Sequence, residues 1–265
     1  MNDAIAAAVA DIDATFGVAA HDWATGETVM HNADRPFITA SVIKFPILLA
    51  ALDRVQQGDL ALTERVELRP EDIVGGSGLL KEFDAGVQLT VKDYLTAMIV
   101  ISDNSATNLM LRLLGIPEVN QYLASLGLTV TRSLRPIRFP APLPGEPRGI
   151  GETTPAEMMR LLDMLVSGAI LNTDLRDLAL DILRRQQYSD AIPRYLPDGV
   201  VVAHKDGMVN DVRGDVGIVY PPDRSPITIA VLCDSLTDRR YSVDNPGWLG
   251  IGRISRIVYD SWVAD

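Results

Sequence analysis

Three short motifs in this chain carry side chains that together can perform covalent catalysis with a serine. They are Ser41-Val42-Ile43-Lys44, Ser102-Asp103-Asn104 and Lys205-Asp206-Gly207, in that order. A serine hydroxyl is a weak nucleophile until a base removes its proton. Lys44 follows Ser41 by three residues, so on a helix the two side chains share one face and the amine can approach the hydroxyl. The three motifs together therefore predict covalent catalysis by Ser41.

The second and third motifs supply the side chains that such a reaction needs around the nucleophile. We expect the Ser102 hydroxyl to relay a proton to the leaving group and Asn104 to hydrogen-bond the substrate amide, while Asp103 anchors the loop. Lys205 would hold the relay serine and make the site more positive. The predicted catalytic residues are Ser41, Lys44, Ser102 and Lys205.

Backbone groups near the third motif are expected to contact the substrate as well. Gly207 has no side chain, so a substrate can lie close to its strand. Backbone N–H groups of Ser41 and of a residue just beyond Gly207, which we take to be Val209, would form an oxyanion hole. We therefore place Gly207 and Val209 among the substrate-binding residues.

Hydrophobic periodicity and turn residues indicate which elements position these motifs. The predicted helices cover residues 3–14, 40–55, 90–101, 104–114, 154–165, 173–186 and 249–263. The predicted strands cover residues 16–22, 28–31, 200–204, 216–220 and 227–233. Thr154, Pro155 and Glu157 are typical of a helix start with a capping box. The first motif thus lies at the head of a buried helix, the second between two helices, and the third at the end of a strand.

Strands at both ends of the chain, with a helical block between them, predict an α/β fold of the α+β type. We expect an antiparallel sheet flanked by helices, formed by residues 1–39 and 190–265, and an inserted all-helical domain formed by residues 40–189. The active-site cleft would lie between them, since small-molecule sites are common at domain interfaces. Residues 132–151 contain five prolines and three glycines and no apolar period, which predicts a long functional loop.

Composition excludes several classes of function. The formal charge of −11 and the pI near 4.7 argue against nucleic acid or an anionic membrane as partner. No apolar run is long enough to span a bilayer, and no signal peptide is recognisable, so we expect a cytoplasmic protein, or a periplasmic or secreted one if an export signal has been removed. His21, His31 and His204 lack metal-ligand spacing, so we predict neither a metal nor another cofactor. Cys233, the single cysteine, lies in an apolar strand and is predicted to be a buried structural thiol.

Taken together, the three motifs resemble those of the class A β-lactamases and the broader penicillin-recognising serine hydrolases. Residues 89–95 and 153–158 also look like family segments in their usual places, and the resemblance extends over residues 16–262. It implies a two-domain fold of the β-lactamase type, with Ser41 as the acylated nucleophile and Lys44 as its base partner. The substrate would be a small β-lactam, amide or ester.

One departure from this family concerns the water that removes the acyl group. Class A enzymes carry a Glu-x-x-x-Asn motif in the corresponding loop, and its glutamate activates that water. The matching stretch here, residues 134–140, contains no acid. Glu146 and Glu152 are the nearest loop carboxylates and are therefore the candidates for the deacylating base.

A second departure is Asp206, which stands where the family usually has Thr or Ser to bind the substrate carboxylate. A carboxylate there repels another carboxylate and can pair with Lys205, which weakens the positive field for an anionic substrate. Arg213 is a candidate for a substitute cation.

We therefore expect a β-lactamase-like serine hydrolase in which acylation is retained and deacylation is impaired, or whose substrate is a neutral or differently charged ester or amide. Two alternatives stay open: a D,D-peptidase or esterase of the same superfamily, and a penicillin-binding sensor without turnover. The natural substrate and the oligomeric state stay open as well.

Overall fold

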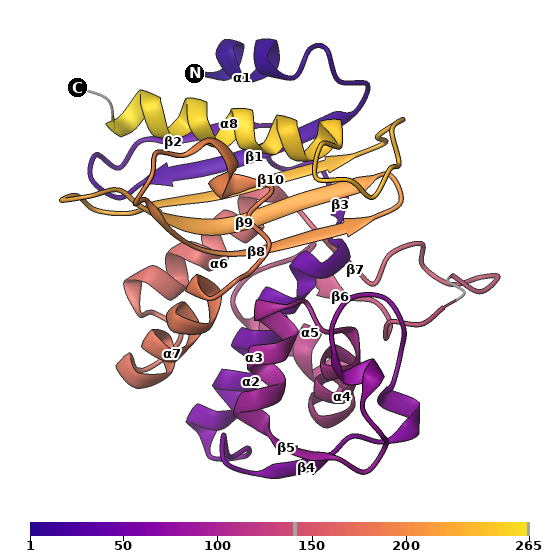
Figure 1. Ribbon diagram of the computed structural model, residues 1–265. Helices are drawn as coiled ribbons and strands as arrows, with labels where there is room; N and C mark the ends of the chain where they lie inside the picture. The colour runs from indigo at the N-terminus through magenta and orange to yellow at the C-terminus, as the bar shows by residue number, and fades with distance from the viewer. Residues whose placement is uncertain (140–141, 264–265) are drawn as a thin grey trace.

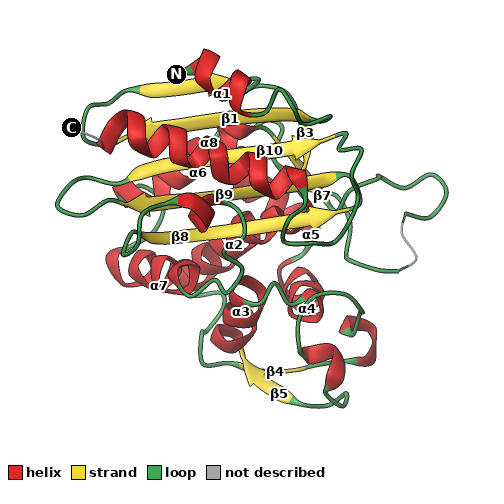
Figure 2. Ribbon diagram, turned by 45° about the horizontal axis from the view of Figure 1, so that its top comes forward, coloured by secondary structure: helices red, strands yellow, loops and turns green. Residues whose placement is uncertain are grey.

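A five-stranded antiparallel sheet forms the centre of the protein, with the strand order β2-β1-β10-β9-β8. The computed structural model describes residues 1–139 and 142–263. The strands are β1 (Thr15–Asp22), β2 (Thr28–His31), β8 (Val201–Val209), β9 (Val212–Tyr220) and β10 (Ile227–Asp234). Strands from the two ends of the chain therefore lie side by side (Figures 1 and 2).

Helices cover both faces of this sheet (Figure 1). The helices α1 (Asn2–Ala8) and α8 (Pro246–Val263) lie on one face, and α6 (Pro155–Ser167) and α7 (Thr173–Arg184) lie on the other. Because successive strand residues point to opposite faces, the sheet contributes to two apolar cores. Val18, Ala20 and Val231 pack toward α8, whereas Ala19 and Leu232 join the core around the central helix.

The remaining helices surround α2 (Lys44–Gln57), whose residues 44–52 are all buried. They are α3 (Val91–Val100), α4 (Asn104–Leu114) and α5 (Ile116–Ser125). Two minor sheets accompany them, formed by β4 (Arg65–Glu67) with β5 (Gln88–Thr90), and by β3 (Phe37–Ile38), β7 (Gly151–Thr153) and β6 (Arg132–Ser133). Short 3₁₀ turns are η1 (Ala40–Ile43), η2 (Pro70–Asp72), η3 (Leu80–Glu82) and η4 (Ile192–Tyr195).

This architecture confirms the predicted fold class: an antiparallel sheet with flanking helices and a helical region inserted between its strands. The domain boundaries at residues 40 and 190 stay a prediction, and α6 and α7, which we assigned to the inserted domain, pack against β1, β10 and β8. Among the described residues, no helix combines the length and the apolarity needed to cross a bilayer.

Several predicted elements differ in their limits. The helix α1 ends at Ala8, and its one buried residue is Ile5, so little packing supports the predicted extension to residue 14. The helix α5 is absent from the predicted elements, because Gly115 and Pro117 directly after residue 114 are also typical of the end of a helix. Gly115 does end α4, with φ of 83°, but Pro117 lies in the first turn of the next helix, where its missing N–H costs nothing.

Two local predictions about side chains had different outcomes. Cys233 is fully buried, as predicted, and burial raises the pKa of its thiol to about 12. Thr154 caps α6 by accepting the Glu157 N–H at 3.1 Å, but the capping box is wrong. The Glu157 carboxylate instead accepts backbone N–H groups of residues 129–131 at 2.6–3.2 Å, which holds the start of the long loop to α6.

Candidate active site

The first three residues of the Ser41 motif lie in η1, a tight turn that leads directly into α2, and Lys44 is the first residue of α2. Ala40, immediately before Ser41, has φ of 44°, a left-handed conformation that is strained for a residue with a side chain. The turn packs against β8: a Cβ atom on Gly207 would lie 2.7 Å from both Ser41 N and Val42 N. We expected Gly207 to make room for substrate. The structure shows that its missing side chain makes room for the backbone of the nucleophile's turn.

Lys44 connects the first motif to the second. Its side chain is fully buried, and Nζ donates to Ser102 O at 2.7 Å, to Ser102 Oγ at 3.1 Å and to Asn104 Oδ1 at 2.9 Å. Burial holds the pKa of Lys44 well below its usual range, and the positive charge of Lys205 lowers it further, against the opposing effect of Asp103 and Asp206. A lysine in this environment loses its proton more readily than an exposed one and can then serve as a base.

The second motif lies in the connection between α3 and α4, where Ser102 has φ of 53°. The prediction that Asp103 anchors this connection is confirmed. Its Oδ1 accepts the Ala106 N–H at 2.8 Å as the N-cap of α4, and its Oδ2 accepts the N–H groups of Leu79 and Leu80 at 2.6 and 2.8 Å. Asp103 thus holds Ser102 and the facing loop in fixed positions.

Asp103→Ala is expected to lower the free energy of unfolding by about 2–4 kcal/mol, because it removes a helix cap and leaves buried N–H groups without an acceptor. Asp103→Asn, which keeps one side-chain oxygen, should lose less. Urea denaturation of both variants measures the difference. A loss below about 1 kcal/mol for Asp103→Ala, the low end for one unsatisfied buried group, would contradict the anchoring role.

The third motif lies within β8 and not at its end, because the strand continues to Val209. Lys205 is fully buried, and its Nζ donates to Asp206 O and to Asp206 Oδ1, both at 2.7 Å. The predicted pairing of Asp206 with Lys205 is confirmed. The Lys205 amine thus binds Asp206 and makes no hydrogen bond to Ser102, the contact that we predicted. Gln186 also donates to Asp206 Oδ1, at 3.3 Å.

The pairing of β8 with β9 decides which backbone N–H can face the oxyanion. Val209 pairs with Val212 across the two-residue turn at Asn210 and Asp211, and β8 is an edge strand. The pair that closes a two-residue hairpin exchanges both backbone hydrogen bonds. In the next pair each N–H points away from the partner strand, which for β8 is the free edge of the sheet. The N–H of Val209 therefore points to β9. We therefore take the expected oxyanion N–H to be that of Met208, on the free edge of β8, while Val209 lines both lobes of the cleft described below.

The cleft at Ser41 consists of two adjoining hollows that share Ser41, Asn104, Phe139, Met208, Val209 and Tyr241. The first, which we call the Ser102 lobe, has a volume of about 400 Å³. It is lined by Ser41, Gly76, Ser77, Ser102, Asn104, Phe139, Tyr188, Asp190, Asp206, Gly207, Met208, Val209, Tyr241 and Trp248. The second, the Arg135 lobe, has a volume of about 360 Å³ and adds Arg135, Ile137, Arg138 and Arg148 from the long loop. The structure thus brings together residues of all three motifs. The aromatic residues and Asp190 belong to no motif, so the sequence contained no signal for them.

The two loop carboxylates predicted as deacylating bases do not line either lobe. Glu146 pairs with Arg138 and accepts the Leu143 N–H, and Glu152 pairs with Arg132 at 2.8 Å. Both predictions are therefore corrected. At the wall of the Arg135 lobe stands Ile137, which is buried.

The position of Ile137 is defined by hydrogen bonds of its backbone to one side chain. Its N–H donates to Asn108 Oδ1 at 2.8 Å, and its carbonyl accepts from Asn108 Nδ2 at 2.7 Å. Asn108 belongs to α4, the helix that begins at the second motif. The loop is thus held against the element that carries Asn104, with an apolar side chain at the cleft wall.

Arg213, the predicted substitute cation, is fully buried and does not line either lobe. Its guanidinium donates to the backbone oxygens of Asn210, Val212 and Arg240 at 2.7–2.9 Å and lies 5.7 Å from the Tyr241 ring centre. Burial lowers its pKa. Its contacts indicate that Arg213 supports the β8–β9 turn and Tyr241, so its assignment as a substrate-binding cation is corrected.

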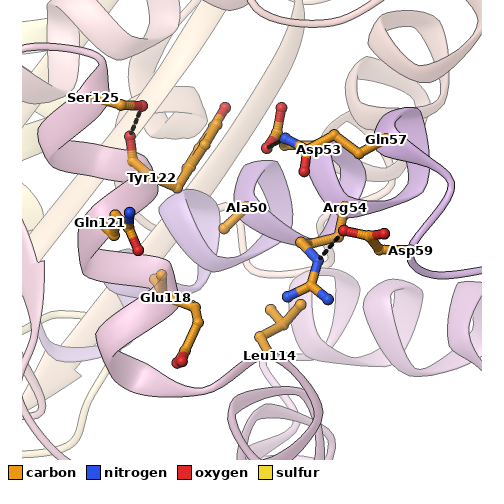
Figure 3. A pocket seen from close by; sticks show the side chains of 11 residues that line it. Ala50, Asp53, Arg54, Gln57, Asp59, Leu114, Glu118, Gln121, Tyr122 and Ser125 are labelled. Atoms are coloured by element: carbon orange, nitrogen blue, oxygen red, sulfur yellow. Dashed lines mark hydrogen bonds and ion pairs between the residues drawn. The ribbon is translucent and has the colours of Figure 1, made fainter.

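A further hollow of about 470 Å³ lies between α2 and α5, away from all three motifs (Figure 3). Asp53, Arg54 and Asp59 line one side, and Glu118 and Tyr122 line the other. It shares no lining residue with the two lobes at Ser41, so we assign it no part in the chemistry.

Comparison with known proteins gives matches over nearly the whole chain. A family model described as "Beta-lactamase enzyme family" matches residues 1–262. A beta-lactamase of Streptomyces albus G is 34% identical over 228 residues, which are 83% of this chain and 72% of that protein. The crystal structure of the beta-lactamase from Sphaerobacter thermophilus is similar with a TM-score of 0.89 and 34% identity, over 98% of this chain and 95% of that one. The acyl-enzyme complex of a PBP-A mutant with penicillin G is similar with a TM-score of 0.89 and 32% identity, over 98% and 95%.

Proposed function

The chain belongs to the class A β-lactamase family of serine hydrolases, and from this premise we propose that it cleaves a β-lactam or a related amide or ester through an acyl-enzyme on Ser41 that is released slowly. One observation carries the proposal. Lys44 contacts both Ser102 and Asn104 beside the nucleophile, whereas an isoleucine, and no acid, stands at the cleft wall where the loop faces Ser41. The contacts of Lys44 support acylation. The isoleucine offers no base for deacylation.

In the acylation step, the neutral amine of Lys44 takes the proton from the Ser41 hydroxyl as the oxygen attacks the substrate carbonyl. The negative charge that develops on the carbonyl oxygen is stabilised by the N–H groups of Ser41 and Met208. The proton then passes from Lys44 to Ser102, 3.1 Å away, and from the Ser102 hydroxyl to the leaving atom. The carbon–leaving-group bond breaks, and the acyl group remains as an ester of Ser41.

Deacylation requires a water molecule and a base that accepts its proton. The described carboxylates that line the two lobes are Asp190 and Asp206, both on the Ser102 side, and Asp206 is already paired with Lys205. Ile137 in the Arg135 lobe cannot accept a proton. These features support slow release, and the PBP-A mutant, whose complex with penicillin G was solved as an acyl-enzyme, illustrates such an intermediate in a similar fold.

Intact-protein mass spectrometry over time tests the proposal. Wild type and Ser41→Ala are each incubated with a penicillin, a cephalosporin and an activated ester. We expect an adduct that requires Ser41 and persists after the free compound is removed. An adduct that clears rapidly as product accumulates would contradict slow release and indicate an efficient β-lactamase. The absence of adduct and product with all three compounds would contradict acyl-enzyme chemistry on Ser41.

The same experiment separates the alternative functions. An adduct formed by β-lactams that never clears, with no turnover of the ester, favours a penicillin-binding sensor. Clearance of the ester but not of the β-lactams favours a D,D-peptidase or esterase.

A further inference from the structure

We infer that the leaving group of the natural substrate carries a positive charge, which the carboxylates of Asp206 and Asp190 receive in the Ser102 lobe. The substrate class is an ester or amide whose departing alcohol or amine bears an ammonium group. This inference rests on the proposed function, because it takes Ser41 as the acylated residue and Ser102 as the proton relay.

The position of Ser102 determines which lobe receives the leaving group. Of the two lobes, the Ser102 lobe contains the relay hydroxyl, and the Arg135 lobe does not. The leaving atom must take its proton from Ser102 as the bond to the carbonyl carbon breaks. The leaving group therefore lies in the Ser102 lobe, and the acyl group extends from Ser41 into the Arg135 lobe.

The Ser102 lobe offers acceptors for a cation. Asp206 Oδ1 receives Lys205 and Gln186, whereas its Oδ2 has no hydrogen-bond partner among residues 1–139 and 142–263. The Asp206 side chain is 14% exposed and lines the lobe, so a ligand in the lobe can reach this second oxygen. An anionic leaving group would instead lie against a carboxylate, with repulsion that solvent screens only in part.

Asp190 adds a second carboxylate to the same lobe. Its side chain is 40% exposed and lies 4.0 Å from Arg194, which binds Asp244 more closely at 3.0 Å. The two charged side chains that line the lobe, Asp206 and Asp190, are thus both carboxylates, and Lys205 pairs with the first of them. Tyr188 lines this lobe and not the Arg135 lobe, and aromatic ring faces attract cations.

The Arg135 lobe has the opposite polarity. Arg138 and Arg148 pair with Glu146 and Asp211, and Arg135 has no carboxylate within ion-pair distance in the described part of the chain. The Arg135 guanidinium donates to the backbone oxygens of Pro147 and Pro136, both at 3.2 Å. A cationic leaving group is thus attracted to the lobe that contains Ser102 and repelled from the other, which fixes the orientation of the substrate.

Three thioesters with one common acyl group test this inference. Their leaving thiols are thiocholine, its neutral carbon isostere 3,3-dimethylbutanethiol, and the anionic 3-mercaptopropionate. All three form the same acyl-enzyme, so differences in the first burst of thiol release report acylation alone. Each rate is divided by the rate of the same ester with hydroxide, because thiocholine is the more acidic thiol and leaves more easily, and the rates compared below are these corrected rates. We expect the thiocholine ester to acylate wild type about 10-fold faster than the neutral isostere, and the anionic ester to be slowest.

Two variants assign the preference to its residues. Asp206→Asn should bring the ratio of cationic to neutral rates close to one, and Asp190→Asn, at a more exposed position, should lower it less. Because Asp206 also affects the pKa of Lys44, absolute rates will change, but that effect is common to the three esters and cancels in the ratio. Thermal denaturation checks that each variant is folded. If Asp206→Asn does not fold, Asp190→Asn still tests the charge preference.

The possible failures are distinguishable. A wild-type ratio of one or below, with a Ser41 adduct present, overturns the charge preference and leaves the proposed function standing. A high ratio that persists in both aspartate variants overturns the assignment to these carboxylates. The absence of any Ser41 adduct with all three thioesters removes the proposed function, and the inference with it.

Discussion

Ile137→Glu is expected to accelerate release of the acyl group from Ser41 by about 10²- to 10⁴-fold, the usual contribution of a positioned general base. Ile137 lines the Arg135 lobe together with Ser41, and its backbone is held on both sides by Asn108. A glutamate there would place a carboxylate in the cleft on a backbone that is already fixed. The nearby Arg135 and Arg138 favour its ionised form, against the opposing effect of burial.

The measurement is the decay of the isolated acyl-enzyme, followed by mass spectrometry after removal of free penicillin. Ile137→Gln is the matched control. Glutamine is polar and nearly the same size as glutamate, but its amide cannot take a proton from water. The rate of adduct formation should change little in either variant, and the rate of adduct decay should rise in the Glu variant. Equal acceleration in the Gln and Glu variants would indicate a loosened loop, and no acceleration in the Glu variant would show that the carboxylate does not reach the water.

Lys44→Met is expected to slow acylation by about 10²- to 10⁴-fold, because it removes the base and the proton route to Ser102 while keeping an unbranched side chain in the buried site. Lys44→Arg, which retains a cation without an accessible base, should be slow as well. The burst of product release with an activated ester measures this rate. Recovery of activity in Lys44→Arg would show that Lys44 acts through its charge alone.

The pH dependence of acylation should follow the pKa of Lys44. The protonated amine cannot accept the Ser41 proton, so the rate rises with pH and levels off above a pKa that lies well below the usual range of lysine. Lys205 lowers this pKa, so Lys205→Met should raise it and move the rise to higher pH. Asp206 raises the pKa, so Asp206→Asn should move the rise to lower pH. Shifts in the same direction for both variants would contradict the assignment of the rise to Lys44.

The fold and the three catalytic motifs could be predicted because they depend on patterns within short segments. The strand 227–233 and the helix 104–114 have apolar periods that tertiary contacts reinforce, and both appear nearly as predicted. Local reasoning was insufficient where one residue type fits two roles. Pro117 suits both the end of one helix and the first turn of the next, and Glu157 suits both a capping box and the loop contact that it makes.

The sequence by itself determined which groups can react: a serine with a lysine one helical turn away, a relay serine, and a loop without an acid where the family has one. The tertiary structure decided where the other groups lie. Strand register directs the N–H of Val209 to β9 and leaves that of Met208 free, ion pairs hold Glu146 and Glu152 outside the cleft, and backbone carbonyls bind the guanidinium of Arg213. These outcomes depend on contacts between segments far apart in the chain, and no local pattern of residues encodes the direction of one N–H or the partner of one charge.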